Sequence, residues 1–327
     1  MKKIICLILC IVLTLGALSS CTMLSSSSRE KRTVLTVGDY EVPYEVYYYI
    51  VENLKKDLPD ADGETLEGEA FEMIREIYAV FSLAEDFGID PDDKYISSIV
   101  DDAQSAAIEE CGSKKEYKKT LAESYMNNSV FRFMKKHSQT AEELYSAMIG
   151  SGKYARGDEE ITALCKGDEF ICVKQILIMT KDSVRTADDT FYTPAAQHTD
   201  EEALAIAKKA HERAVQGEDF DKLVNEYGES FYMFNNTDGY YVCRGMWEEA
   251  NEECVFSLEV GEVSEIVKSE SGYSIFLRCE KSDGYIEDNV DKLANDYYDA
   301  CYKLLVEKKV AELEIKKTEA FDTIEEE

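Results

Sequence analysis

The chain has 327 residues, and its 67 acidic side chains outnumber its 36 lysines and arginines, which gives a formal net charge of −31 at pH 7. This excess of negative charge excludes nucleic acid as a natural partner, because the phosphates would be repelled. It also keeps the protein body away from an anionic membrane surface. The charge either serves solubility alone or favours basic, unfolded protein partners.

The N-terminus has the pattern of an export signal. Two lysines precede an apolar run, Ile4–Leu18, that is too short to span a bilayer and is typical of a signal-peptide core. The sequence Leu-Ser-Ser-Cys at positions 18–21 resembles a bacterial lipobox, whose cysteine becomes the lipid-modified first residue. We therefore predict a signal peptide over 1–20, lipidation at Cys21 and a tether over 21–32, which places the protein at the extracytoplasmic face of the bacterial cell membrane. The alternative is an ordinary signal peptide followed by an incidental cysteine.

The cysteines beyond the signal form no recognisable metal or redox motif. Besides the predicted lipidation site, the mature chain keeps Cys111, Cys165, Cys172, Cys243, Cys254, Cys279 and Cys301. An odd number cannot all pair within one chain. None forms a CxxC motif, which argues against a zinc site and a thioredoxin-like redox site. We expect no cofactor and mostly unpaired thiols packed as small apolar side chains, with some disulfides as the alternative.

The remaining polar motifs do not predict a metal or hydrolytic site. The acidic segment Asp60–Gly63, with Glu69 after it, partly matches a calcium loop, but Leu58 holds the first ligand position. Calcium needs an oxygen ligand there, so a solvated loop is favoured and no metal is predicted. The mature histidines fall in different predicted elements and are expected at the surface; they are His137, His198 and His211. No arrangement of nucleophile, histidine and acid is found.

Residues 33–165 have the pattern of a helical domain that opens with a hairpin. Alternation over Val34–Val42 predicts two short strands, and a helix over Tyr44–Leu54 follows Pro43. Apolar residues recur at helical spacing over Ala70–Phe87. Further helices are expected over 92–111, 113–124, 126–136 and 139–149. The tyrosines at the start of the first helix belong either to the core or to an aromatic surface for unfolded chains.

Residues 166–283 mix strand and helix patterns. An apolar strand is predicted over Cys172–Ile178, and the polar residues between Thr180 and Thr199 indicate an insertion after it. Residues 205–230 contain a Gly-Glu-Asp-Phe sequence. Residues 254–281 contain Gly-Glu-Val-Ser and Ser-Gly-Tyr sequences, followed by an apolar run.

In this order, the segments resemble a parvulin-type (PpiC-like) peptidyl-prolyl isomerase domain. The resemblance is carried by CVKQILI (172–178), AIAKKAHERAVQGEDFDKLVNEYGES (205–230), DGYY (238–241), RGMW (244–247) and CVFSLEVGEVSEIVKSESGYSIFLRCEK (254–281). The opening of the helical domain adds to this resemblance. The chain as a whole is similar to PrsA/SurA-like lipoprotein foldases. The resemblance implies an α+β fold, in which a helical chaperone domain holds an inserted parvulin-like module with a four-stranded antiparallel sheet and helices.

The C-terminal residues 284–327 return to a helical pattern. Apolar side chains form one stripe from Val290 to Leu305, and a final strand is predicted between Glu312 and Thr323. In the foldases that this chain resembles, the C-terminal segment packs on the N-terminal domain. The resemblance therefore implies that 33–165 and 284–327 form one discontinuous domain around the module of residues 166–283.

The resemblance also implies a degenerate catalytic site. Parvulins hold two facing histidines and a Cys or Asp in a hydrogen-bond network beneath an apolar proline pocket; here Gln175 and Ser274 replace the histidines, and Ser230 lies near the third position. The implied substrate-binding residues are Tyr240, Tyr241, Met246, Trp247, Asn251 and Phe256. Among them, Trp247 and Asn251 align with the Met and Phe of the pocket. An amide and two hydroxyls can still form hydrogen bonds, so binding is expected to outlast turnover.

Together, these patterns predict a membrane-anchored extracytoplasmic foldase or chaperone. It would bind unfolded or partly folded exported proteins that contain proline segments. Its peptidyl-prolyl isomerase activity is expected to be weak or lost, because both family histidines are replaced. The alternative is a non-catalytic surface lipoprotein that binds one specific folded partner.

Overall fold

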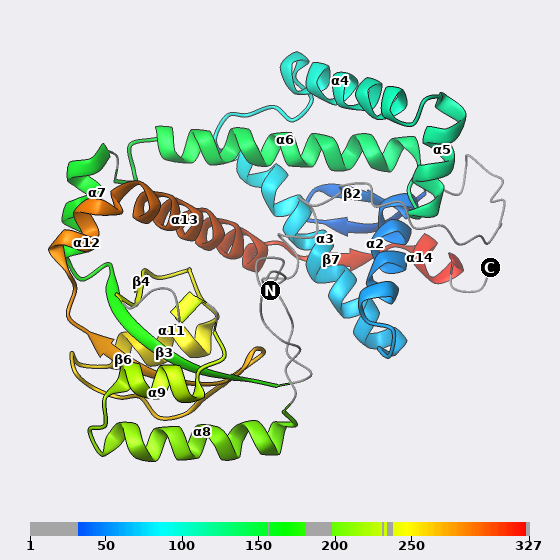
Figure 1. Ribbon diagram of the computed structural model, residues 1–327. Helices are drawn as coiled ribbons and strands as arrows, with labels where there is room; N and C mark the ends of the chain where they lie inside the picture. Colours follow the sequence, from blue (N-terminus) through cyan, green and yellow to red (C-terminus); the bar gives the residue numbers. More distant parts are fainter. Residues whose placement is uncertain (1–31, 156, 181–197, 231, 234–237, 325–327) are drawn as a thin grey trace. The chain divides into compact units, whose positions relative to one another are not determined.

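The computed structural model describes residues 32–155, 157–180, 198–230, 232–233 and 238–324 (Figure 1). The predicted signal peptide, Cys21 and most of the insertion predicted between Thr180 and Thr199 lie outside these residues. The chain divides into two compact units: Gly152–Leu304 forms one, and the residues before it together with Leu305–Glu327 form the other. No described helix is long and apolar enough to cross a membrane.

The unit formed by the described residues before Gly152 and after Leu304 contains a three-stranded antiparallel sheet with the order β2-β1-β7. The strands are β1 (Thr33–Val37), β2 (Tyr40–Pro43) and β7 (Ile315–Lys317). The predicted hairpin is confirmed: Gly38, with φ +54°, takes the left-handed conformation that its turn requires. The prediction of a long final strand is wrong, because only three residues pair with β1 before helix α14 (Glu319–Ile324) begins. That helix forms because Phe321 packs edge-on against Tyr47 and Phe71.

Five further helices complete this unit. They are α2 (Tyr44–Asp57), α3 (Gly63–Asp86), α4 (Lys94–Glu110), α5 (Lys114–Glu123) and α6 (Asn128–Gly150). Asp62, Asp93, Ser113 and Asn127 each cap the following helix by accepting a backbone N–H. The prediction of separate helices over 126–136 and 139–149 is wrong. The apolar stripe of α6 continues without a break from Val130 to Met148, so nothing ends the helix between them.

His137 corrects a second prediction in the same helix. It was expected at the surface, but only 5% of the residue is exposed. Its ring packs edge-on against Phe81, with the centroids 5.6 Å apart. Neither ring nitrogen has a hydrogen-bond partner among the described residues. Burial lowers the pKa of His137 to about 4, so the side chain is neutral at pH 7.

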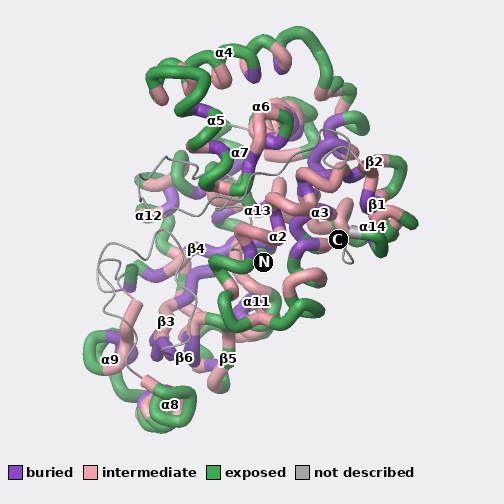
Figure 2. The backbone as a smooth tube through the Cα atoms, turned by 90° about the vertical axis from the view of Figure 1, so that its right-hand side faces the viewer, coloured by how far each residue is buried: buried purple, intermediate pink, exposed green. Residues whose placement is uncertain are grey.

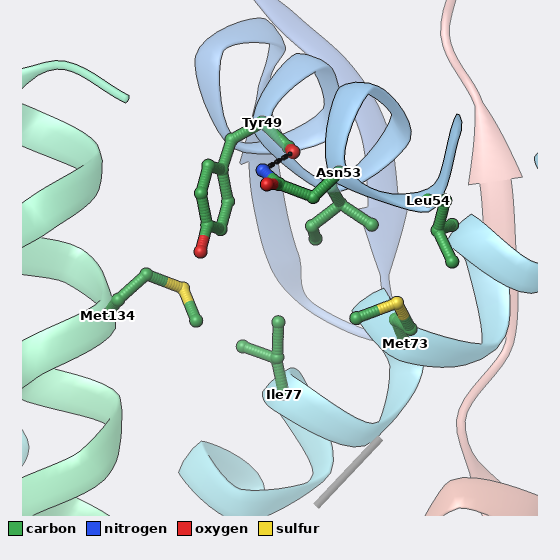
Figure 3. A pocket seen from close by; sticks show the side chains of 7 residues that line it. Tyr49, Asn53, Leu54, Met73, Ile77 and Met134 are labelled. Carbon is green, nitrogen blue, oxygen red and sulfur yellow. Dashed lines mark hydrogen bonds between the residues drawn. The ribbon is translucent and has the colours of Figure 1, made fainter. Parts of the chain in front are cut away.

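A small apolar pocket lies in the core of this unit, between α2, α3 and α6 (Figure 3). Its lining consists of Tyr49, Ile50, Asn53, Leu54, Met73, Ile77 and Met134. Figure 3 shows Met134 projecting from α6 toward the space between Tyr49 and Ile77. The amide of Asn53 donates to the carbonyl oxygen of Tyr49 at 2.7 Å, so the pocket's polar side chain is partly satisfied within α2.

The other unit is built on a four-stranded antiparallel sheet with the order β4-β3-β6-β5. The strands are β3 (Ile171–Met179), β4 (Tyr240–Val242), β5 (Val267–Ser269) and β6 (Gly272–Cys279). Its helices are α7 (Gly157–Lys166), α8 (Asp200–Val215), α9 (Phe220–Tyr227), α11 (Glu249–Ser257), α12 (Asp283–Asp288) and most of α13 (Val290–Glu312). The predicted α+β fold with a four-stranded antiparallel sheet is confirmed.

The two faces of this sheet are covered by different helices. On one face, Ile176 and Ile275 pack against α8, which presents the buried alanines Ala203, Ala207, Ala210 and Ala214. Small side chains let the helix lie close to the sheet. On the other face, Val173 and Phe276 pack against Val255 of α11. Figure 2 shows the result: β3 and β6 are mostly buried, whereas α4 of the other unit is mostly exposed.

Candidate functional site

The two positions that replace the family histidines meet on one face of the sheet. Gln175 of β3 is opposed to Phe276 of β6, and Leu177 is opposed to Ser274, so these four residues share the face that α11 covers. The side-chain amide of Gln175 donates to Ser274 Oγ at 2.9 Å. Ser274 is 0% exposed and Gln175 is half-buried. The bond satisfies the buried hydroxyl and joins the two central strands.

A row of aromatic rings leads to this hydrogen bond. Tyr240 of β4 stacks on Tyr232 with the ring centroids 4.4 Å apart, and meets Trp247 edge-on at 5.3 Å. Trp247 in turn lies 5.6 Å from the ring of Phe276, which is opposed to Gln175. We call Tyr232, Tyr240, Trp247 and Phe276 the aromatic row. Ser230, assigned near the third network position, shares a hydrogen bond of 3.0 Å with the hydroxyl of Tyr240.

A buried carboxylate holds the turn that carries Trp247. Glu252 of α11, 8% exposed, accepts the backbone N–H of Gly245 at 2.6 Å and that of Trp247 at 3.0 Å. From α13, Lys303 donates to the carbonyl oxygens of the same two residues at 2.9 and 3.3 Å. Gly245 has φ +92°, and a Cβ there would lie 2.8 Å from Leu304 Cγ, so this tight turn requires glycine.

Three other predicted binding residues lie around α11 but do not join the aromatic row. Asn251 is buried; its amide donates to Glu248 Oε1 at 2.8 Å, and its Oδ1 has no partner among the described residues. Met246 accepts the backbone N–H of Cys243 through its sulfur at 3.2 Å. The guanidinium carbon of Arg244 lies over the ring of Phe256, 3.9 Å from the ring centroid.

Tyr241 lies apart from the other predicted residues. Successive residues of a strand point to opposite faces, so Tyr241 points away from Tyr240 and the aromatic row. Its ring stacks on Tyr285 with the centroids 4.4 Å apart, and its hydroxyl accepts the backbone N–H of Ser282 at 2.7 Å. Burial raises the pKa of Tyr241 to about 12. The residue therefore ties β4 to α12, and the structure places it outside the site.

Glu229 anchors the segment that carries Ser230. Its carboxylate accepts the backbone N–H of Met179 at 2.6 Å and lies 2.8 Å from His198 Nε2. Its own backbone N–H donates to the carbonyl oxygen of Leu177 at 2.9 Å. These bonds hold Ser230 against the end of β3, within reach of Tyr240.

Known proteins are similar to this part of the chain. Residues 176–280, about a third of the chain, match the family model described as rotamase, PPIC-type PPIase domain. The match covers this module and not the rest of the chain. The predicted recognition of a parvulin-type domain in a PrsA-like chain is confirmed by this match and by a curated relative. That relative, the foldase protein PrsA of Halalkalibacterium halodurans, is 33% identical over 100 residues, which are 30% of this chain and 30% of that protein.

Several solved structures are also similar. Peptidyl-prolyl isomerase ESS1 from Candida albicans shares 28% identity over 35% of this chain and 64% of that one, with a TM-score of 0.31. PrsA from Bacillus anthracis shares 15% identity over 73% of this chain and 96% of that one, with a TM-score of 0.37. PrsA from Streptococcus pneumoniae shares 14% identity over 93% of this chain and 98% of that one, with a TM-score of 0.33.

The chemistry available to the PPIC-type module is hydrogen bonding beside aromatic surface. Gln175 and Ser274 are both neutral, and neither titrates in the physiological range, so the pair offers no change of protonation. The rings of Tyr240 and Trp247 offer apolar faces of the kind on which proline rings pack. No cluster of three or more His, Cys, Asp or Glu side chains in the described part of the chain is arranged to hold a metal ion.

Proposed function

We propose that this chain is an extracytoplasmic foldase, anchored to the cell membrane by a lipid on Cys21. Its PPIC-type module binds proline-containing segments of unfolded or partly folded exported proteins, with weak or absent isomerase turnover. The observation that carries the proposal is the 2.9 Å hydrogen bond from Gln175 to Ser274. Ser274 lies within the residues that match the rotamase family model, and Gln175 immediately precedes them. The resemblance expects histidines at both positions.

Weak turnover follows from what the reaction needs. Rotation about an X-Pro bond crosses a barrier of about 20 kcal/mol, and a catalyst lowers it by binding the twisted amide better than the planar one. Each lost hydrogen bond to the transition state costs about 1–3 kcal/mol, or roughly ten- to a hundredfold in rate. Because Gln175 and Ser274 are bonded to each other, a substrate must also compete with that bond.

The aromatic row supports binding without turnover. Tyr232 is 37% exposed, and its ring continues the stack toward Tyr240 and Trp247. Aromatic surfaces bind extended proline segments because such segments are already ordered and present a flat apolar ring. The row therefore supports recognition of a client's proline by shape rather than by charge.

The helical unit supports contact with unfolded chains. Tyr44, Tyr48 and Tyr125 form a second line of rings, with centroids 5.7 and 6.2 Å apart, and Tyr125 is 36% exposed. These partly exposed rings favour broad rather than specific binding of apolar side chains.

The proposal is tested by the aggregation of a chemically denatured exported enzyme, diluted with and without the mature chain, residues 21–327. We expect suppression at stoichiometric amounts. Tyr125→Asn is the test variant, because Asn tolerates the φ of +56° at this position. Tyr95→Asn, at a 58% exposed tyrosine of α4, is its matched control. No suppression by the mature chain would exclude the chaperone role.

The number of different proteins that this chain binds distinguishes a foldase from a lipoprotein with one specific partner. Crosslinking in cells followed by capture of the protein is expected to recover many unrelated exported proteins. Recovery of one folded protein at a fixed stoichiometry would instead show a binding lipoprotein with a single partner.

A further inference from the structure

Two cysteines face each other across the central strands of the PPIC-type module. Cys172 of β3 and Cys279 of β6 are directly opposed in the antiparallel register, on the sheet face that points away from Gln175. Opposed residues in an antiparallel pair have Cα atoms about 4.5–5.5 Å apart. A disulfide accommodates Cα separations of about 4.4–6.8 Å. The backbone spacing therefore suits a disulfide between these two residues.

The two thiols already interact in the reduced protein. The Cys172 thiol donates its hydrogen to the carbonyl oxygen of Asp238, with 3.2 Å between sulfur and oxygen. The neighbouring Cys172 side chain lowers the pKa of Cys279, and the ammonium group of Lys174 lowers it further, whereas burial and Asp221 oppose the effect. The interaction with Cys279, together with burial, raises the pKa of Cys172. Cys279 is therefore the more nucleophilic partner at neutral pH, because the thiolate is the reactive form.

The two cysteines also differ in their exposure to solvent. Cys279 is half-buried, whereas only 1% of Cys172 is exposed, so Cys279 is the more accessible residue of the two. A reactive, accessible thiol beside a buried partner is the arrangement of an attacking and a resolving cysteine.

We propose that Cys172 and Cys279 form a redox-active pair that closes to a cross-strand disulfide by exchange with a small disulfide such as glutathione disulfide. The Cys279 thiolate attacks one sulfur of glutathione disulfide, forms a mixed disulfide and releases one glutathione thiolate. Cys172 then loses its proton and attacks the Cys279 sulfur, which releases the second glutathione. The protein loses two electrons and two protons, and one glutathione disulfide becomes two glutathione thiols.

The other described cysteines of the unit Gly152–Leu304 are less readily ionised. Burial raises the pKa of Cys165 to about 11 and also raises that of Cys243. It likewise raises the pKa of the half-buried Cys254 and Cys301. Exchange is therefore expected to begin at Cys279 and to end at Cys172.

The disulfide would link the strands that carry the candidate site. Gln175 lies in β3 and Ser274 in β6, so closing the pair fixes the register of these two strands. The closed loop contains roughly a hundred residues, and a loop of this size strongly restricts the unfolded chain. Oxidation is therefore expected to raise the thermal unfolding temperature of the module.

The first test is oxidation of the reduced mature protein by glutathione disulfide at neutral pH, followed by peptide mass mapping. We expect a peptide pair that joins Cys172 to Cys279, and an intact mass lower by about 2 Da because two hydrogens leave. Cys172→Ala should stop the reaction at a glutathione adduct on Cys279, and Cys254→Ala, the matched control, should still form the link. A main disulfide between other cysteines would overturn the proposal.

A second measurement avoids any effect of substitution on folding. The wild-type protein is alkylated with iodoacetamide across a pH series, and each cysteine's rate is read by mass spectrometry. Cys279 should react first and should reach its half-maximal rate at a lower pH than Cys254 or Cys301. A rate for Cys279 no greater than that of Cys254 or Cys301 would overturn the proposal.

Discussion

Gln175 of β3 and Ser274 of β6 are diagonal neighbours on one face of the sheet and share a hydrogen bond of 2.9 Å. The Ser274 hydroxyl is fully buried, so without this partner it would pay the cost of a buried, unsatisfied polar group. The bond therefore stabilises the sheet of the PPIC-type module. It also occupies the face on which the resemblance places catalysis, so one pair of residues links the fold of this module to its expected weak turnover.

The single tryptophan of the chain offers a direct probe of peptide binding. Trp247 is half-buried and lies between Tyr240 and Phe276 in the aromatic row. A proline peptide that packs on this row would remove water from the indole, so titration should shift and enhance the tryptophan emission. Tyr232→Ala should weaken the binding by about 1 kcal/mol or more, because one ring of the stack is lost. The binding surface lies elsewhere if a second binding measurement shows that the peptide saturates the protein while the tryptophan emission does not change.

The sharp bend before β6 should be intolerant of any side chain. Gly272 has φ +133°, and a Cβ there would lie 2.1 Å from the carbonyl oxygen of Ile178. We expect Gly272→Ala to destabilise the module by about 3–5 kcal/mol. Gly261→Ala is the matched control: its φ is +87°, but no atom lies within 4 Å of a Cβ, so only the backbone cost of about 1–2 kcal/mol remains. Equal losses in urea unfolding would contradict the steric argument.

His137 should make the helical unit sensitive to acid. Its pKa is lowered by burial to about 4, against about 6.5 in an unfolded chain. The stability that depends on neutral His137 is therefore complete above about pH 6.5 and is lost as the pH falls toward 4, by about 3 kcal/mol in total. His137→Leu should remove this part of the acid sensitivity, because leucine needs no proton and no partner.

The measurement for His137 is amide exchange within α6 at several pH values, which reports the opening of this helix rather than of the whole chain. Protonation of carboxylates also destabilises proteins in acid, so the informative quantity is the difference between the variant and the wild type. A difference that does not change between pH 7 and pH 4 would mean that His137 gains a partner or water in solution.

The sequence predicted more of the fold than of the site. The order of the motifs, through the family resemblance that it carries, was enough to predict the sheet of the PPIC-type module. The resemblance also assigned Gln175 and Ser274 to the histidine positions, and these residues lie next to each other on one face of the sheet. Tyr240 and Tyr241 could not be separated, because an uncertainty of one residue in a strand reverses which face a side chain occupies. The structure decides this through the register of β4 with β3.

Other parts of the site depend on tertiary contacts that a local sequence pattern does not predict. Glu252 and Lys303 hold the turn at Gly245 from two different helices, 7 and 58 residues away in sequence. Tyr232 joins the aromatic row through a stack that only the tertiary fold creates. His137 could have been placed correctly, because it follows Met134 at helical spacing on the buried stripe of α6.

Membrane attachment should depend on one cysteine. If the proposed lipidation occurs, Cys21→Ala should release the protein from the membrane fraction, because the acyl chains added at Cys21 would supply the anchoring energy. Cys111→Ala, the control, should leave the protein attached. The measurement is fractionation after a high-salt wash, which removes proteins held by surface charge alone. Persistent attachment of the Cys21 variant would show an anchor other than the lipid.

Restoring the histidines tests whether the site is otherwise intact. The double variant Gln175→His with Ser274→His should raise isomerase activity if the aromatic row still binds proline. A gain of roughly tenfold or more would correspond to at least one recovered transition-state hydrogen bond. No gain, in a variant that still folds and binds peptide, would mean that the pocket has changed along with the network.

The most direct test is the isomerase rate of the wild-type mature protein. It is measured by NMR exchange on several X-Pro peptides, with an ordinary parvulin assayed alongside under the same conditions. Because both histidines are replaced and Gln175 is bonded to Ser274, we predict a kcat/KM at least about a hundredfold below that of the parvulin. A rate equal to that of the parvulin would contradict the account, since it would show that an amide and a hydroxyl serve the reaction as well as two histidines.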